Sequence, residues 1–189
     1  MKSFVLAVAL AAIGTAALAE PATYAIDPTH TFVTFESPHF NTSTNRGRFD
    51  KKSGTVTLDK AGKSGKVELT IDMTSINTGV EPFNKHLKGA DFFDAEKFPT
   101  ATFSGDKFVF DGDKVTAVSG RLTVRGKTNP VTLKALRFNC YQNPMLKREA
   151  CGGDFETTIQ RSQWGIDFGL KMGAADDTKL IIQVEAIQQ

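Results

Sequence analysis

The chain has 189 residues, with 23 basic and 21 acidic side chains and a formal net charge of +2. A charge this close to zero gives no electrostatic reason to expect a nucleic acid or an anionic membrane as partner. The length suits one domain with a substantial hydrophobic core.

The N-terminus has the pattern of an export signal. Lys2 is followed by an uncharged apolar run at residues 4–18, which ends in a small-residue cleavage site at Ala19. A membrane anchor is the alternative, but a spanning helix needs about 20 apolar residues and this run is shorter. We therefore expect residues 1–19 to be a cleaved signal peptide and residues 20–189 to form one exported domain.

Apolar and polar residues alternate with a period of two along much of the mature chain. Val67, Leu69 and Ile71, for example, alternate with polar neighbours. Such alternation is typical of antiparallel strands that have one face in water. Many short strands at regular spacing indicate a sandwich or a barrel. The expected strands lie at residues 31–37, 55–58, 66–74, 108–110, 115–124, 131–138, 155–159 and 180–187.

Turn residues separate several of these strands. Asp111-Gly112-Asp113 is typical of a hairpin turn between two strands. Other breaks are expected at Gly62, Gly65, Gly126 and Asn129-Pro130.

One segment departs from the strand pattern, and residues 82–98 are predicted to form one or two short helices. Pro82 suits a first helical turn, Gly89 a C-terminal stop, and Asp91 an N-cap before two phenylalanines. Phe83 and Leu87 would then share a helix face.

The two cysteines, Cys140 and Cys151, both lie in the mature part of the chain. In an oxidising compartment two nearby cysteines form a structural disulfide, which here would stabilise by roughly 3 kcal/mol. A metal pair or a redox pair are the alternatives, but the spacing differs from C-x-x-C and no histidine is close in sequence.

Catalytic and metal-binding motifs are not found in the sequence. The three histidines, His30, His39 and His86, have no metal-ligand spacing, and no G-x-S-x-G nucleophile motif is present. Residues 120–128 imitate a phosphate-binding loop, but they alternate like a strand that runs into a turn. Asp91 and Asp94 could serve acid–base catalysis, although helix capping explains Asp91 more simply. We therefore predict a protein that is not an enzyme and has neither cofactor nor metal.

Phenylalanine is the residue type that stands out, with 15 in the chain. Five of them gather in and just after the expected helical insert: Phe83, Phe92, Phe93, Phe98 and Phe103. Each one alone suits core packing. As a set they indicate an apolar lumen capped by an aromatic segment, because a barrel of about eight strands can enclose one ligand.

The same segment resembles a known family. The run KHLKGADFFD at residues 85–94, followed by KFP at 97–99 and ATF at 101–103, is similar to the signature of the YceI-like family. LTVRGKTNPV at residues 122–131 and Arg161-Ser162 add further matches. The resemblance implies an all-β, antiparallel, lipocalin-like β-barrel of about eight strands with a short helical insert capping an apolar lumen. It also implies a secreted or periplasmic protein that binds isoprenoid lipids, such as quinones or polyprenyl diphosphates.

The sequence departs from the family pattern at one pair. Phe83-Asn84 stands where the family often has Arg-Asp before the x-H-L motif. Loss of that pair favours a neutral head group, such as that of ubiquinone, over a charged one.

The leading hypothesis is therefore a periplasmic carrier for a polyprenyl lipid held in the barrel lumen. For strands of about ten residues, the barrel would be shorter than a tail of eight isoprene units, so a homodimer that shares one tail is possible. The alternative is a stress or structural protein whose barrel is filled by its own side chains. The candidate ligand-binding residues are Val33, Phe35, His39, Phe49, Phe83, Asn84, His86, Phe92, Phe93, Phe103, Trp164 and Phe168, with Asn84, Lys85 and His86 as candidates for the polar head. For His86, a hydrogen bond that holds the cap to the barrel is the competing role.

Overall fold

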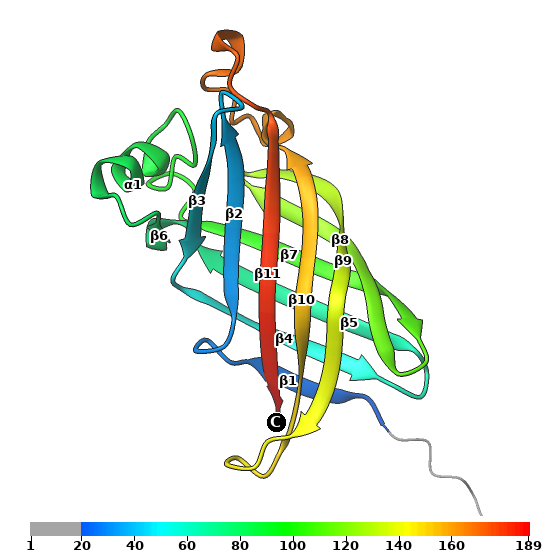
Figure 1. Cartoon of the computed structure of the whole chain (residues 1–189). Coiled ribbons are helices and arrows are strands. Elements are labelled where there is room, and N and C mark those ends of the chain that lie inside the picture. The colour runs from blue at the N-terminus through cyan, green and yellow to red at the C-terminus, as the bar shows by residue number, and fades with distance from the viewer. Residues whose placement is uncertain (1–19) are drawn as a thin grey trace, which may run out of the picture.

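Eight strands form a closed antiparallel barrel, as the sequence predicts (Figure 1). The computed structural model describes residues 20–189, so the expected signal peptide lies outside the described residues. The ring closes because β11 pairs with both β10 and β1. In order around the barrel the strands are β1 (Ala22–Ile26), β4 (Lys52–Asp59), β5 (Ser64–Asp72), β7 (Thr100–Asp111), β8 (Lys114–Val124), β9 (Lys127–Gln142), β10 (Glu149–Gln160) and β11 (Asp177–Gln188).

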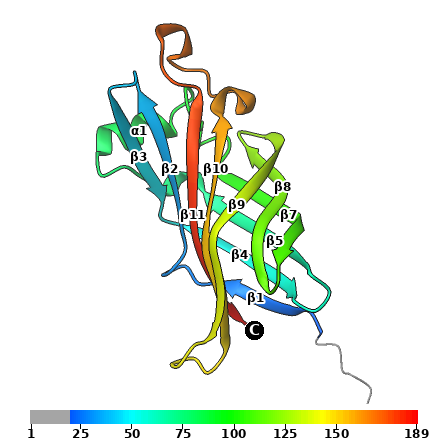
Figure 2. The same ribbon diagram turned by 45° about the vertical axis from the view of Figure 1, so that its right-hand side comes forward.

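Strand β11 changes its partner along its length, and this extends one wall of the barrel. Residues 186–188 pair with β1, whereas residues 179–183 pair with β2 (Phe32–His39). Strand β2 forms a hairpin with β3 (Ser43–Phe49), which in turn pairs with β6 (Ile76–Asn77). Figures 1 and 2 show the β2–β3 hairpin at the end of the barrel opposite the C-terminus. We call that end the mouth and the other end the floor.

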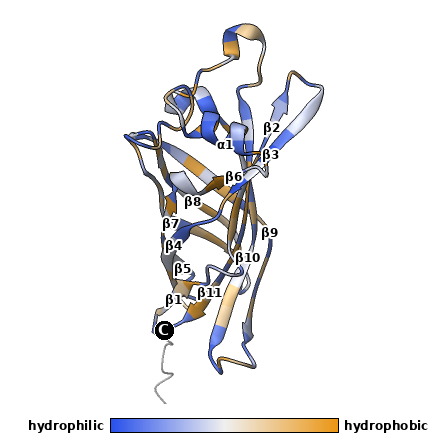
Figure 3. Ribbon diagram, turned by 90° about the vertical axis from the view of Figure 1, so that its left-hand side faces the viewer, coloured by the Kyte–Doolittle hydropathy of each residue, from blue (hydrophilic) through white to orange (hydrophobic). Residues whose placement is uncertain are grey.

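The insert between β6 and β7 contains one helix rather than two. Helix α1 (Glu81–Lys88) has Pro82 in its first turn and ends at Gly89, as expected. Residues 90–98 form turns, because the backbone N–H groups of residues 92–95 donate back to the carbonyls of residues 87–89. The prediction that Asp91 caps a second helix is therefore wrong. Figure 3 shows that α1 is mostly hydrophilic, in contrast to the alternating strands.

Three short 3-10 helices complete the described elements. They are η1 (Met73–Ser75), η2 (Arg161–Trp164) and η3 (Leu170–Met172). The last two lie in the connection between β10 and β11.

Three of the five turn predictions are confirmed and two are wrong. Gly65 lies inside β5, where it pairs with Leu58. Asp111 pairs with Lys114 across a tight hairpin, and Arg125 and Gly126 turn the chain from β8 into β9 with positive φ. Asn129-Pro130, however, lies inside β9. Proline is tolerated there because β10 pairs with β9 only from Lys134 onward, so Pro130 has a strand neighbour on one side.

The barrel strands are also longer than expected. Strands β7 to β11 have 11 to 16 residues, where about ten were expected. A 12-residue strand such as β11 is about 40 Å long along its own axis. The lumen is therefore longer than the sequence estimate, which reduces the mismatch with a long lipid tail.

Phenylalanine rings on the inner wall lie over glycines. Phe35 is directly opposite Gly47, and a Cβ atom at Gly47 would come within 2.5 Å of the ring. Phe103 lies in the same way against Gly105, and Phe108 against Gly65, each 3.0 Å from such a Cβ. Glycine at these positions gives the rings room to lie along the wall.

In residues 20–189, the helices are too short and too polar to cross a lipid bilayer.

Candidate ligand-binding site

The lumen contains two neighbouring chambers that share part of their wall. The upper chamber, at the mouth, has a volume of about 440 Å³, and the lower chamber, toward the floor, about 110 Å³. Four apolar residues line both chambers and form what we call the neck: Val33, Ile71, Leu122 and Leu180. The upper chamber alone falls in the range of 300–1,000 Å³ that is usual for small-molecule sites. The barrel is therefore not filled by its own side chains.

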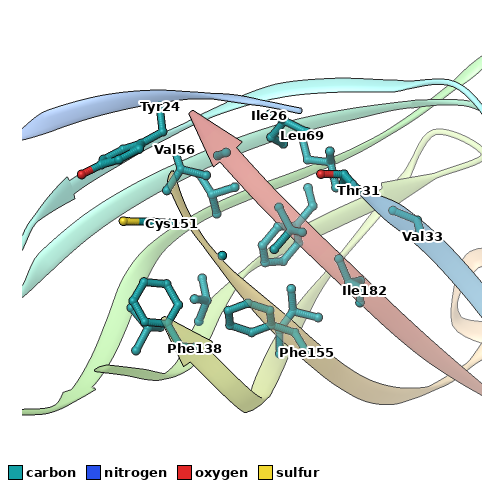
Figure 4. A pocket seen from close by; sticks show the side chains of 18 of the residues that line it. Tyr24, Ile26, Thr31, Val33, Val56, Leu69, Phe138, Cys151, Phe155 and Ile182 are labelled. Carbon is teal, nitrogen blue, oxygen red and sulfur yellow. The ribbon is translucent and has the colours of Figure 1, made fainter. Parts of the chain in front are cut away.

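The lower chamber is a hydrocarbon environment. Its wall consists of aliphatic and phenylalanine side chains from all eight barrel strands and from β2. Figure 4 shows Tyr24 and Cys151 at one end and Val33 at the other. The hydroxyl of Thr31 donates to the carbonyl of Glu185 at 3.1 Å, and that of Tyr24 donates to a carboxylate oxygen of Glu149 at 2.5 Å. Because both hydroxyls already have acceptors, this chamber suits an apolar tail.

A polar cluster closes the floor below the lower chamber. Lys60 Nζ donates to both carboxylate oxygens of Glu149 at 2.7 Å, beside the Tyr24 bond. Burial alone would raise the pKa of Glu149, but the hydrogen bonds from Lys60 and Tyr24 outweigh it and lower that pKa. Burial, together with the bond to the Glu149 carboxylate, raises the pKa of Tyr24 far above its usual value.

The predicted disulfide joins Cys140 and Cys151 next to this cluster. The two cysteines lie directly opposite each other on β9 and β10. Cys151 also lines the lower chamber. The bridge therefore ties together the two strands that form the wall at the floor end.

Aromatic rings from several elements form a large part of the lining of the upper chamber. Phe49 of β3 contacts Phe93 of the insert edge-on, with ring centroids 5.7 Å apart. His86 packs against Phe92 at 4.8 Å and against Phe168 at 5.1 Å. The rings thus connect the insert both to the β2–β3 hairpin and to the loop between η2 and η3.

Trp164 lies at the boundary of the two chambers. Its side chain is 2% exposed and lines the upper chamber. The indole Nε1–H donates to the carbonyl oxygen of the neck residue Leu122 at 3.0 Å. As the single tryptophan in the chain, it offers an intrinsic fluorescence signal for anything that enters.

Polar contacts hold the insert in place over the mouth. Asn84 is 6% exposed, and its Oδ1 accepts from both the backbone N–H and the hydroxyl of Thr78 at 2.8 Å. Arg125 donates to the carbonyls of Gly165 and Ala90, and so links the η2 turn to the insert. These contacts position the aromatic lining without forming part of it.

Most of the residues predicted from the sequence lie around the lumen. Phe103 lines the lower chamber, and Val33 lines both. Asn84 lines neither, because its amide is bonded to Thr78, and Lys85 is exposed on the outer side of α1. The others line the upper chamber, namely Phe35, His39, Phe49, Phe83, His86, Phe92, Phe93, Trp164 and Phe168.

Sequence reasoning missed two groups of lining residues. The first is the aliphatic wall of the lower chamber, including Val56, Val118 and Val131. Strand alternation identified these strands. Because every second residue of a barrel strand points inward, the same alternation could have identified these residues. The second is Arg161, a charged residue on the wall of the upper chamber, which no strand pattern indicates because it lies in η2.

Comparisons with known proteins place the chain among similar sequences and folds. A family model described as the YceI-like domain matches residues 24–186. Protein YceI of Salmonella newport (strain SL254) is 36% identical over 192 residues, which cover 100% of this chain and 97% of that protein.

Solved structures share the same architecture. BcnA of Burkholderia cenocepacia is 28% identical and superposes with a TM-score of 0.71, covering 85% of this chain and 99% of that one. A polyisoprenoid binding domain from Saccharophagus degradans, implicated in plant cell wall breakdown, is 18% identical with a TM-score of 0.64, covering 90% and 100%. At that identity the second similarity concerns the fold alone.

Proposed function

Since the chain belongs to the YceI-like family, we propose that it is a periplasmic carrier that holds a long-chain isoprenoid lipid in its two-chambered lumen. The observation that carries the proposal is the pair of adjoining apolar chambers inside the barrel, one at the aromatic mouth and one toward the floor. We propose a binding role rather than a catalytic one, which membership of the family supports.

The physical chemistry of such a lumen suits an isoprenoid tail. Each 100 Å² of apolar surface removed from water contributes about 2.5 kcal/mol before ordering costs. The tail would lie along the lower chamber and the neck, and the head group would lie in the upper chamber near its polar residues. The Saccharophagus domain, which is described as polyisoprenoid binding, supports this class of ligand by analogy of fold.

Export and assembly complete the proposal. Residues 1–19 would be removed as a signal peptide, and residues 20–189 would act as one domain in the periplasm, where a disulfide such as Cys140–Cys151 forms readily. The bound lipid would be an isoprenoid quinone or a polyprenyl diphosphate. A tail too long for both chambers would be shared with a second copy in a homodimer.

The test is native mass spectrometry of the protein purified from its own periplasm, followed by organic extraction and identification of the lipid. We expect a stoichiometric isoprenoid, and the intact mass would show whether one lipid serves one barrel or two. Protein that is consistently empty, and that also rejects added polyprenols, would contradict the carrier proposal.

A further inference from the structure

Among residues 20–189, Arg161 is the only residue with a permanent charge that lines either chamber. It is 9% exposed, at the start of η2, and it lines the upper chamber but not the neck. The other lining groups that can carry charge near neutral pH are the imidazoles of His39 and His86. The upper chamber therefore contains one fixed positive charge and no carboxylate on its wall.

The guanidinium of Arg161 is anchored on one side and open on the other. Its Nε donates to the carbonyl of Ala175 at 2.9 Å, and Nη1 donates to the carbonyl of Ile166 at 2.8 Å. The hydrogen bonds of the described residues leave Nη2 without a protein partner. Among these residues, however, no fully buried side-chain nitrogen or oxygen lacks a partner. Nη2 is therefore accessible, and Arg161 is part of the wall of the upper chamber.

Neighbouring residues do not neutralise this charge by direct contact. Arg161 takes part in none of the ion pairs of residues 20–189. Asp167 and Asp176 act on it through space only, and Asp176 instead accepts hydrogen bonds from the backbone and hydroxyl of Ser162. A buried cation without a contacting counter-ion favours an anionic ligand, because charge-assisted hydrogen bonds from guanidinium to phosphate or carboxylate are stronger than neutral ones.

We propose that Arg161 is a head-group receptor, and that the carrier prefers a lipid with an acidic head, a phosphate or a carboxylate, over a neutral one. The proposal rests on the proposed function, since it concerns the head of the lipid that the lumen holds. Arg161 of η2 supplies a positive charge on the wall of the upper chamber, where Phe83 of the insert supplies none. This reverses the preference for a neutral head group that the sequence suggests.

The alternative role for Arg161 is purely structural. Its two carbonyl bonds tie the η2 turn to the loop before β11, and a clamp of this kind would have the same buried geometry. The two roles differ in one measurable property. If Arg161 is only a clamp, its replacement changes the affinity for all ligands with the same tail by the same factor. If it is a receptor, its replacement weakens ligands with a charged head more than those with a neutral head.

The test uses three ligands that share one tail: geranylgeraniol, geranylgeranylacetone and geranylgeranyl phosphate. Binding to the delipidated full mature protein is followed by Trp164 fluorescence. Geranylgeranoic acid, as a fourth ligand, separates the effect of a carboxylate from that of a phosphate. We expect the phosphate to bind about ten to a hundred times more tightly than the alcohol or the ketone, because one charge-assisted hydrogen bond is added. Binding of the phosphate and the ketone with equal affinity by the wild type would overturn the proposal, whatever the variants do.

Two variants assign the preference to Arg161. Arg161→Gln should bring the phosphate-to-alcohol ratio close to one, and Arg161→Lys should restore part of it. Arg125→Gln is the matched control, since Arg125 also binds two backbone carbonyls near the mouth but lines neither chamber. An undiminished ratio in Arg161→Gln would refute the assignment. If none of the four ligands bound to the wild type, the carrier proposal itself would fail instead.

Discussion

The two ends of the barrel are built in different ways. The floor is formed by strands that pair with each other around the full ring, and it is tied by the Cys140–Cys151 disulfide and sealed by the cluster around Glu149. The mouth is completed by a hairpin, a short helical insert and a loop, which meet mainly through aromatic rings. The floor is thus suited to bound hydrocarbon and the mouth to selection and entry.

A larger side chain at the neck is expected to have the largest effect on ligand affinity, because it would separate the upper chamber from the lower one. Val33→Phe should exclude the tail from the lower chamber, whose volume of about 110 Å³ holds roughly four carbons, each worth about 0.8 kcal/mol of burial. After ordering costs, affinity for geranylgeraniol should fall about tenfold to a hundredfold, while geraniol is little affected. Trp164 fluorescence titration measures both.

The control for Val33→Phe is Val124→Phe, which makes the same change in a residue that lines the upper chamber only. It should weaken short and long ligands alike. If Val33→Phe also weakened both equally, the lower chamber would not be a tail site.

Removal of the disulfide should destabilise the floor and leave the mouth unchanged. The bridge closes a short loop with a sequence separation of 11. The double variant Cys140→Ser, Cys151→Ser should lose about 3 kcal/mol of unfolding free energy, or about 6–12 °C in Tm. Calorimetry measures the loss, and geraniol affinity in the folded variant should stay within about twofold. A large loss of geraniol binding would show that the two ends are coupled.

Asn84→Ala should loosen the mouth and leave the floor unchanged, which is the reverse of the disulfide variant. It leaves the backbone N–H of Thr78 without its acceptor, at a cost of about 1–3 kcal/mol. We expect faster hydrogen exchange in residues 78–98 and unchanged exchange in the floor strands. Loss of lipid affinity with unchanged exchange would instead support the direct ligand contact that the sequence suggested for Asn84.

The smallest expected effect concerns the pH dependence of the floor. Because the pKa of Glu149 is lowered from 4.5 in the folded state, its charge stabilises the fold above about pH 4.5, and this contribution is lost as the pH falls through the lowered pKa. Glu149→Gln should therefore be less stable than the wild type at pH 7, by less than about 1 kcal/mol, since the Lys60 pair is partly exposed. The difference should vanish in acid. Urea unfolding at both pH values tests this, and a difference that persists in acid would rule out the ionic explanation.

The sequence predicted the floor strands well because their alternation follows directly from the two-residue period of a strand. It missed β3, whose residues Ser43–Phe49 are mostly polar and include Gly47 under the ring of Phe35. It also missed β1, which has only five residues, and β6, which has two. Long alternating runs carry a strong signal, whereas strands of this kind depend on tertiary partners.

The candidate site was predictable where aromatic residues cluster along the chain. His86, Phe92 and Phe93 are close in sequence, and all of them line the upper chamber. Arg161 was visible in the sequence only as part of a family match, because its place on the chamber wall comes from burial in η2, which depends on the loops around it. Asn84 shows the reverse case, a polar residue in the right segment whose amide is used by a neighbouring backbone group.

The glycines beneath the phenylalanine rings make the capacity of this barrel unusually easy to change. Each ring lies along the wall only while the facing residue has no side chain, as Gly47 shows opposite Phe35. A single methyl group there would come within 2.5 Å of the ring and displace it. The room inside the barrel therefore depends on glycines of the wall, and it can change by point mutation without any change in topology.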